Sequence, residues 1–373
     1  MLAAATAALL TAFATSWLVL LSRKAHEKLS IDDAIPGLHK IHKTPVPRIG
    51  GLGILAGVAA GALFLEQQSQ LQWMSLFLVA ALPAFAGGLL EDLTRKVSPY
   101  SRLLFAFGAA AVGFFLLDAG VTDLDLPYDD YLFKYEMFAF GFTLFAVGGF
   151  AHATNIIDGM NGLAGLVGVA ILAAIAGVAW QVNDDTVLHA ALIVAAATTG
   201  FLLWNYPRGV IFAGDGGAYF LGFAIAELAV LLVHRNSEVS PWFALLVLGY
   251  PVWETIYSMY RRKALHGRSP AEPDGLHLHT LVYRRLIRKG GPVARSAFTT
   301  LYMLVLALFT VVPAWLFWDE TWILQTYAAG FACIYLWLYW RIVHFATPWG
   351  LARRGTPAHD SPQTPRNPSG GTL

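Results

Sequence analysis

The chain alternates long apolar stretches with short polar segments. Each apolar stretch is close to the length that a helix needs to cross a bilayer, about 20 residues. Eleven such stretches can be recognised: 2–21, 50–65, 73–90, 103–117, 137–154, 163–180, 187–204, 218–233, 242–260, 297–318 and 322–343. The pattern therefore predicts an all-α polytopic membrane protein with about eleven transmembrane helices.

Positive charge is distributed unevenly among the polar segments. Cytoplasmic loops of membrane proteins are enriched in Lys and Arg. With the N-terminus placed outside, 23 of the 25 Lys and Arg residues fall on the cytoplasmic side, and only Lys134 and Arg235 fall outside. Because Arg23 and Lys24 follow the first apolar stretch, we interpret this stretch as a retained span rather than a cleaved signal peptide. The charge pattern predicts an outside N-terminus and a cytoplasmic C-terminus.

Composition narrows the class of protein. Hydrophobic residues make up 57% and charged residues 13% of the 373 residues, so no soluble domain is expected. We expect one integral-membrane domain, residues 1–346, and a disordered cytoplasmic tail, residues 347–373, rich in Pro, Gly, Ser and Thr. The single cysteine, Cys333, excludes an intramolecular disulfide and a cysteine-based metal site. The net charge of +1 says little about partners, and no nucleic-acid partner is expected.

Five polar clusters interrupt the apolar pattern, and the predicted topology places all five at the cytoplasmic ends of spans. The first contains Lys43 and Arg48, two cations that can meet phosphate; an ordinary basic loop is the alternative. The second is the pair Glu91 and Asp92 at the end of the third span. Adjacent carboxylates repel each other unless a divalent cation or water relieves them, so this pair is either a metal site or a solvated helix end.

The third cluster runs from Asn155 to Asn161. Asn155 and Asp158 are three residues apart and share a face of a helical turn. Gly159 leaves backbone donors open to a ligand. Capping of the following helix by Asn161 is the alternative explanation for part of the cluster.

The fourth cluster is centred on Asp215, which stands among three glycines between two apolar stretches and follows Asn205 and Phe212. A lone carboxylate in this setting either faces a ligand or a metal, or caps the next helix. Phe212 offers a stacking surface for a base. We therefore interpret this segment as ligand-facing, with a helix cap as the alternative.

The fifth cluster contains His277 and His279, which alternate with leucines ahead of four basic residues. The pattern predicts an amphipathic segment at the lipid headgroups, beside anionic groups. A zinc site is the alternative, although the HEXXH pattern is absent. Within the spans, we interpret Glu227 and Glu254 as paired inside the bundle and His152 as hydrogen-bonded between helices; an ion path is the alternative.

Together the clusters place four carboxylates with cations and histidines on one face of the bundle: Glu91, Asp92, Asp158 and Asp215. Such a set suits magnesium, which prefers carboxylates, phosphate oxygens and water, and manganese is an alternative. In a membrane-embedded protein, this chemistry indicates phosphoryl transfer from a soluble phosphorylated donor to a lipid acceptor. A secondary transporter, the alternative from another class, would carry its polar residues near mid-membrane, often in repeated halves.

The five ordered motifs resemble those of the polyprenyl-phosphate N-acetylhexosamine-1-phosphate transferases, over nearly the whole chain up to about Trp340. The resemblance implies transfer of a sugar 1-phosphate from a UDP-amino sugar to undecaprenyl phosphate, with release of UMP and a need for magnesium. It also implies a multi-pass protein of the bacterial cytoplasmic (inner) membrane whose active site faces the cytoplasm. A homodimer is compatible with this assignment.

The resemblance also implies roles for individual residues. Asp92 and Asp215 are the metal-site residues, Glu91 helps to deprotonate or orient the lipid phosphate, and Phe212 contacts the uracil. The catalytic set comprises Glu91, Asp92, Asp215, His277 and His279, and the substrate-binding set comprises Lys43, Arg48, Asn155, Asp158, Gly159, Asn161, Asn205 and Phe212.

Three positions depart from the family's pattern. Glu91 and Asn161 each stand where an aspartate is usual, and Thr280 ends the histidine motif. A binding-only relative is therefore a further alternative. Segments 45–48 and 277–280 are closer to the branch that starts O-antigen, teichoic-acid or other surface glycans than to the phospho-N-acetylmuramoyl-pentapeptide transferases of peptidoglycan synthesis. We expect the surface-glycan branch.

Overall fold

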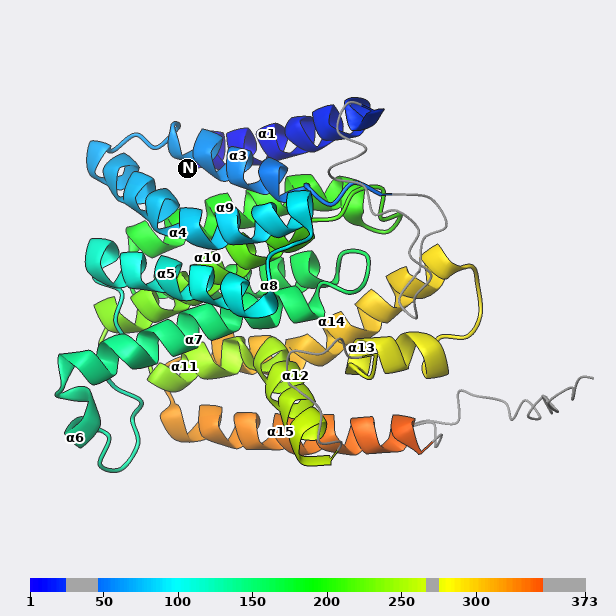
Figure 1. Ribbon diagram of the computed structural model, residues 1–373. Helices are drawn as coiled ribbons and strands as arrows, with labels where there is room; N and C mark the ends of the chain where they lie inside the picture. Colours follow the sequence, from blue (N-terminus) through cyan, green and yellow to red (C-terminus); the bar gives the residue numbers. More distant parts are fainter. Residues whose placement is uncertain (25–45, 266–274, 345–373) are drawn as a thin grey trace, which may run out of the picture.

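The computed structural model describes residues 1–24, 46–265 and 275–344, which fold as a bundle of helices (Figure 1). Lys43 and the predicted tail, residues 347–373, lie outside the described residues. The helices are α1 (Leu2–Leu21), α3 (Gly51–Ala62), α4 (Gln68–Thr94), α5 (Pro99–Leu117), α6 (Asp130–Phe133), α7 (Glu136–Ile157), α8 (Leu163–Gln181), α9 (Asp185–Asn205), α10 (Gly214–Arg235), α11 (Pro241–Val247), α12 (Gly249–Tyr260), α13 (Leu278–Leu281), α14 (Pro292–Leu316) and α15 (Thr321–Val343). Two π-helical turns, η1 (Arg261–Leu265) and η2 (Val282–Leu286), follow α12 and α13.

Eight of the described helices are long and apolar enough to cross a membrane: α1, α4, α5, α7, α8, α9, α10 and α14. They coincide with eight of the eleven predicted spans. The prediction of an all-helical, multi-pass membrane protein is confirmed. Which end of the bundle faces the cytoplasm stays a prediction from the charge pattern.

The other three predicted spans are helical, but each differs from a continuous apolar span. α3 has 12 residues and is therefore about 18 Å long, shorter than the hydrocarbon core of a bilayer. The stretch 242–260 is divided into α11 and α12 at Leu248. Pro251 has no N–H to donate to the Val247 carbonyl, which explains this break. α15 is long enough, but its many Trp and Tyr residues lower its mean hydropathy.

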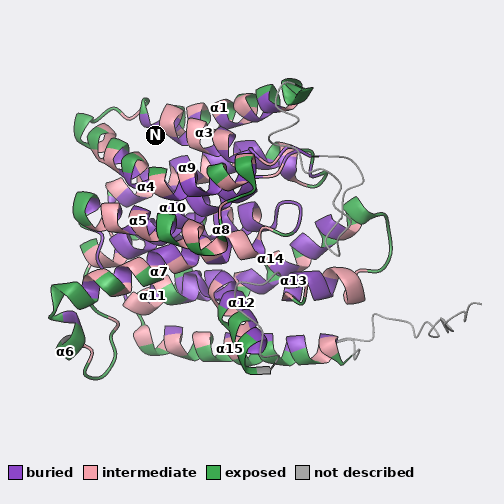
Figure 2. Cartoon of the chain, viewed as in Figure 1, coloured by how far each residue is buried: buried purple, intermediate pink, exposed green. Residues whose placement is uncertain are grey.

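α10 lies at the centre of the bundle. Every residue from Gly214 to Leu232 is buried, so no face of this helix is left for lipid over that length (Figure 2). It packs against α3, α4, α5, α7, α8, α9 and α11. A helix that is apolar on all sides is expected in the core of a large bundle, and α10 fits that rule apart from the carboxylates that it carries.

The ends of α3, α4 and α10 meet closely at one end of the bundle. A side chain at Gly88 of α4 would overlap the backbone of Asp215, so only glycine allows this approach. The segment before α3 also pairs with the segment before α10. The Phe212 N–H donates to the Pro47 carbonyl (2.9 Å), and the Gly50 N–H donates to the Phe212 carbonyl (2.9 Å). These contacts bring polar clusters that are far apart in the sequence to one place.

A buried carboxylate holds helices together at the opposite end of the bundle. Asp184, directly before α9, accepts hydrogen bonds from Arg235 Nε (2.7 Å), from Asn236 Nδ2 (3.2 Å) and from the Val187 N–H (3.1 Å). Burial alone would raise the pKa of Asp184, but these hydrogen bonds hold the pKa below its usual value. The pairing accounts for one of the two cations on the predicted outer side, because Arg235 is neutralised locally.

We expect Asp184→Asn to lower stability at neutral pH by about 1–2 kcal/mol, since a charge-assisted hydrogen bond is lost and Arg235 is partly exposed. The folded-state pKa is depressed, so this contribution is present above the ordinary carboxyl pKa and disappears as the pH falls through the folded-state value. Thermal unfolding of both proteins at several pH values measures the difference. Asp185→Asn, which changes an exposed neighbour, is the control; equal losses in the two variants would contradict the assignment.

Candidate active site

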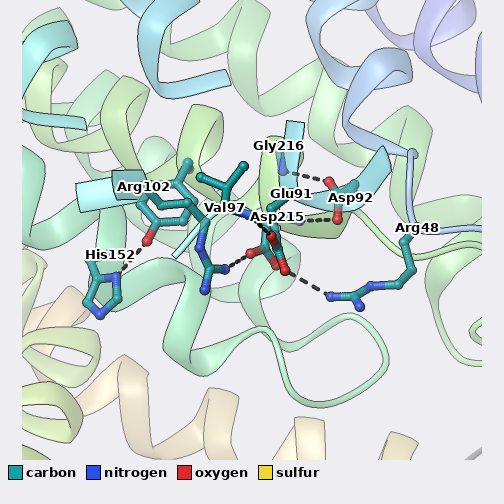
Figure 3. A network of polar contacts seen from close by, with 9 residues as sticks. Arg48, Glu91, Asp92, Val97, Arg102, His152, Asp215 and Gly216 are labelled. Carbon is teal, nitrogen blue, oxygen red and sulfur yellow. Dashed lines mark hydrogen bonds and ion pairs between the residues drawn. The ribbon is translucent and has the colours of Figure 1, made fainter. Parts of the chain in front are cut away.

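The carboxylate of Asp92 holds the first turn of α10. Asp92 lies in the last turn of α4 and is only 5% exposed. Its Oδ1 accepts the N–H of Asp215 (2.9 Å), and its Oδ2 accepts the N–H of Gly216 (2.9 Å; Figure 3). The first N–H groups of a helix have no partner within the helix and carry a partial positive charge. Asp92 therefore caps α10 from a neighbouring helix.

Asp215 itself does not cap α10, which was the alternative reading of its sequence. The helix begins at Gly214, the residue before it is Ala213, and Asp215 lies inside the first turn. Gly214 has a φ of +73°, and a side chain there would overlap the Arg48 carbonyl and the Asp92 carboxylate. Only glycine combines this backbone conformation with this close approach.

Two arginines face the carboxylate of Asp215 (Figure 3). Arg48 Nη2 lies 3.4 Å from Oδ1, and Arg102 Nη1 pairs with Oδ2. Arg48 belongs to the predicted substrate-binding set, and the structure brings it to the predicted metal-site residue. Arg102, in the first turns of α5, was missed and was counted only as a cytoplasmic charge. The signal was available, because an arginine at the edge of an apolar span is expected to have a partner.

The two neighbouring carboxylates Glu91 and Asp92 have different surroundings. Glu91 is half-buried, and its Oε2 accepts the N–H of Val97 (2.7 Å), which closes the turn between α4 and α5. Asp92 points the other way, toward α10. The side chains of Glu91 and Asp92 therefore point in different directions and do not converge on a single ligand.

Asp158 brings a further carboxylate to this end of the bundle. It directly follows α7. Burial among the surrounding helices raises the pKa of the Asp158 carboxyl to about 6, and the positive charge of Arg48 opposes this rise. The negative charges of Asp158 and Asp92 also repel each other. The cluster comprises four carboxylates and two guanidinium groups: Glu91, Asp92, Asp158, Asp215, Arg48 and Arg102.

The surplus of carboxylates over arginines suits a divalent cation. Across residues 1–24, 46–265 and 275–344, no three His, Cys, Asp or Glu side chains are close enough to hold a metal ion by themselves. Magnesium is commonly bound by one or two carboxylates together with substrate phosphates and water, so two protein ligands are sufficient. Asp92 and Asp215 supply two carboxylates of the kind that this requires. In the structure the oxygens of Asp92 accept backbone N–H groups, and those of Asp215 pair with Arg48 and Arg102.

The predicted nucleotide-side residues lie around the turn after α7. Asn155 is in the last turn of this helix, and its carbonyl accepts the N–H of Asp158 (3.3 Å). Gly159 is exposed and faces His279: a side chain at Gly159 would come within 2.7 Å of His279 Nε2. The structure therefore brings the third and the fifth cluster together. Phe212 is half-buried on the segment that leads into α10.

Asn161 and Asn205 are buried and tie the segment between α9 and α10 in place. Asn161 Nδ2 donates to the Pro207 carbonyl (3.0 Å), and Asn205 Nδ2 donates to the Ile211 carbonyl (2.7 Å). Asn161 does not cap α8, since the residue before that helix is Gly162. Their assignment to substrate binding stays a prediction. In the structure, both side chains hold the turn that positions Phe212.

The two histidines stack on each other, with ring centroids 5.5 Å apart and planes 3° from parallel. His277 Nδ1 donates to the carboxylate of Glu254 (3.0 Å), which also accepts a hydrogen bond from Tyr335. Glu254 therefore has partners inside the bundle, as the sequence indicated. Glu227 has none among the residues that the structure describes, so the predicted pairing is wrong for that residue.

His152 is hydrogen-bonded between helices, as predicted. Its Nδ1 lies 2.6 Å from the hydroxyl of Tyr219 in α10 (Figure 3). This contact fastens α7 to α10 one turn beyond Asp215. His152 thus lies beside the carboxylate cluster, and its observed contact is with α10.

Comparisons with known proteins found a family and several relatives of this chain. The sequence profile of glycosyl transferase family 4 matches residues 50–233, which include Asp92, Asp158 and Asp215. A protein of Bacillus subtilis (strain 168), described as a probable undecaprenyl-phosphate N-acetylglucosaminyl 1-phosphate transferase, is 30% identical over 247 residues, covering 65% of this chain and 67% of that protein. Two relatives are described as undecaprenyl-phosphate alpha-N-acetylglucosaminyl 1-phosphate transferases. The one from Yersinia pestis is 26% identical, covering 81% of this chain and 82% of that protein. The one from Escherichia coli (strain K12) is 27% identical, covering 83% of this chain and 84% of that protein.

We expect Arg102→Gln to destabilise the protein by about 3 kcal/mol, because the buried carboxylate of Asp215 loses its nearer partner. Adding Asp215→Asn should restore part of the loss, since the unpaired charge is then removed. Thermal unfolding of the two single variants, Arg102→Gln and Asp215→Asn, and of the double variant tests this. Lys96→Gln makes the same change of charge on an exposed side chain nearby and serves as the control. A double variant that loses the sum of both single effects would show that the two groups are not coupled.

Proposed function

Because the chain belongs to glycosyl transferase family 4, we propose that it transfers an N-acetylhexosamine 1-phosphate from a UDP-sugar to undecaprenyl phosphate and releases UMP. The names of the relatives support N-acetylglucosamine as the sugar and undecaprenyl phosphate as the acceptor. The proposal includes an active site on the cytoplasmic face of a bacterial inner membrane and a role in initiating a surface glycan. The charge pattern supports this orientation.

The observation that carries this proposal is the carboxylate of Asp215, held between Arg48 and Arg102 at the start of a fully buried helix. Guanidinium groups bind phosphate oxygens in a planar, forked geometry. The two arginines are therefore suited to bind the diphosphate of the donor beside the acidic cluster. Asp92 supports this position of Asp215, because its carboxylate accepts a hydrogen bond from the backbone N–H of Asp215.

Asp92 and Asp215 would hold a magnesium ion, which neutralises charge on the transferring phosphate when it is bound. The other side chains bind and orient. Asp158, whose pKa is raised to about 6, can take up or release a proton near neutral pH. Glu91 is half-buried beside Asp92, which supports its proposed role in orienting the lipid phosphate. His279 faces the turn that contains Gly159, which supports its proposed contact with the phosphates of the donor.

The position of the cluster disfavours a transporter. Substrate sites of secondary transporters lie near the bilayer midplane, in discontinuous helices. Here Asp92 is in the last turn of α4, Asp158 follows α7, and Asp215 is in the first turn of α10. The polar groups therefore gather at helix ends, where a soluble nucleotide sugar and a membrane-bound phosphate can meet.

We expect the purified protein to release UMP when it is supplied with magnesium, undecaprenyl phosphate and UDP-N-acetylglucosamine. Asp92→Asn and Asp215→Asn should each lower the rate by about 100-fold or more, since each removes a charge at the reacting phosphates. Removing divalent cations with a chelator should stop the reaction, and magnesium or manganese should restore it. A coupled assay for UMP measures all of these rates.

Asp319→Asn, an exposed carboxylate on the predicted outer side, is the control and should keep the rate of the unmodified protein. UMP release that is unaffected by both Asp92→Asn and Asp215→Asn would contradict the site. A panel of UDP-N-acetylhexosamines in the same assay identifies the preferred sugar. If the protein instead prefers a UDP-linked muramyl-pentapeptide as donor, it acts in peptidoglycan synthesis rather than in the initiation of a surface glycan.

A further inference from the structure

A buried carboxylate outside the acidic cluster organises the histidine motif. Glu254 lies in α12 and is 1% exposed. Its Oε1 accepts a hydrogen bond from His277 Nδ1 (3.0 Å) and one from the Leu278 N–H (3.0 Å), and its Oε2 accepts the hydroxyl of Tyr335 (3.0 Å). A carboxylate is costly to bury unless protein donors replace water. Three donors do so here, and two of them belong to the histidine segment.

These hydrogen bonds determine how the first histidine is oriented. The Leu278 N–H is the first donor of α13, so Glu254 fixes the start of this short helix. With Nδ1 of His277 donating to Glu254, the ring plane is set, and Nε2 points away from the carboxylate. The His277 ring lies parallel to that of His279, 5.5 Å away, and limits where the second ring can lie. The orientation imposed at His277 is thus passed on to His279.

His279 is the member of the pair that reaches the candidate active site. It is 3% exposed, and its Nε2 faces Gly159, next to Asp158. Glu254 is therefore linked to the acidic cluster by a continuous path of contacts. The path runs from α12 through His277 and His279 to the turn after α7.

α15 supports the segment from its other side. The Tyr335 hydroxyl donates to Glu254, and the Tyr339 hydroxyl donates to the Leu276 carbonyl (3.2 Å), directly before the motif. Beyond the motif, Arg285 Nη1 donates to the Ile342 carbonyl (3.0 Å) at the end of α15. The histidine segment is thus attached to α12 and α15, whereas the arginines and carboxylates of the acidic cluster lie on α4, α5 and α10, just before α3 and just after α7.

We propose that Glu254, supported by Tyr335, is a positioning residue that holds His277 and His279 against the Asp158–Gly159 turn. The role of the histidines at the donor phosphates rests on the proposed function. Glu254 bonds to His277, Leu278 and Tyr335 rather than to the acidic cluster, so it acts through His277. Its loss leaves the carboxylates in place and releases the histidines from their fixed orientation.

The test compares two variants with a matched control. Glu254→Gln keeps the shape of the side chain and removes its charge, and Tyr335→Phe removes one donor. Tyr257→Phe is the control, because Tyr257 packs against the rings of Tyr335 (5.7 Å) and Tyr339 (4.7 Å) in the same aromatic cluster without bonding to Glu254. Hydrogen–deuterium exchange of residues 275–281, followed by mass spectrometry, reports the order of the segment independently of the reaction.

We expect Glu254→Gln to raise exchange in residues 275–281 and to lower kcat/KM for UMP release by about 10- to 100-fold, the usual effect of losing a hydrogen bond to a charged group. Tyr335→Phe should produce a smaller change in the same direction, and Tyr257→Phe should leave both quantities unchanged. In a protein that already carries His277→Ala, Glu254→Gln should cause no further loss beyond about twofold, because both changes break the same path.

Unchanged exchange in Glu254→Gln, or a loss that adds fully to that of His277→Ala, would overturn the positioning role. A general packing defect would lower the thermal stability of Tyr257→Phe and Tyr335→Phe alike, and that result would also overturn it. If the unmodified protein releases no UMP from any UDP-N-acetylhexosamine, the proposed function fails. The exchange measurement still decides whether Glu254 orders the histidine segment in that case.

Discussion

Two hydrogen bonds from backbone N–H groups of α10 to the carboxylate of Asp92 hold the site together. They satisfy donors at the start of a buried helix that have no partner within it, and they also satisfy a carboxylate that has little access to water. Because the backbone N–H of Asp215 is one of these donors, the backbone that carries its side chain is fixed relative to Asp92. The arginines then approach a carboxylate whose place is already set. The candidate metal pair is thus part of the architecture of the bundle.

The candidate active site has two halves with separate supports. The acidic half, with its two arginines, depends on the close contact of α3, α4 and α10, which glycines such as Gly88 permit. The histidine half depends on the buried carboxylate of Glu254 and on the tyrosines of α15. The halves meet where His279 faces Gly159. A donor bound there would contact side chains from both halves, so the geometry of the site depends on how accurately the two supports are placed.

Much of this arrangement could be predicted from the sequence, because it follows from hydropathy and from the ends of helices. Long apolar stretches locate eight spans, and Asp92, Asp158 and Asp215 each stand at the boundary of one of them. What could not be predicted depends on contacts between distant residues. Arg102 reads as an ordinary loop charge until α5 lies beside α10, and the same applies to Asn161, whose side chain meets the turn before α10. Glu254 was recognised as paired, but its partner lies 23 residues further along the chain.

The complete burial of α10 has a consequence for how the protein is assembled in the membrane. A helix with no lipid-facing side gains little from the bilayer itself, and this one carries Asp215 and Glu227. Its stability in the membrane must come from other helices. Six of the helices that enclose it, α3, α4, α5, α7, α8 and α9, precede it in the chain and are therefore synthesised before it, and the short helix α11 follows it. Most of the helices that surround α10 have therefore already been synthesised when α10 and its two carboxylates enter the membrane.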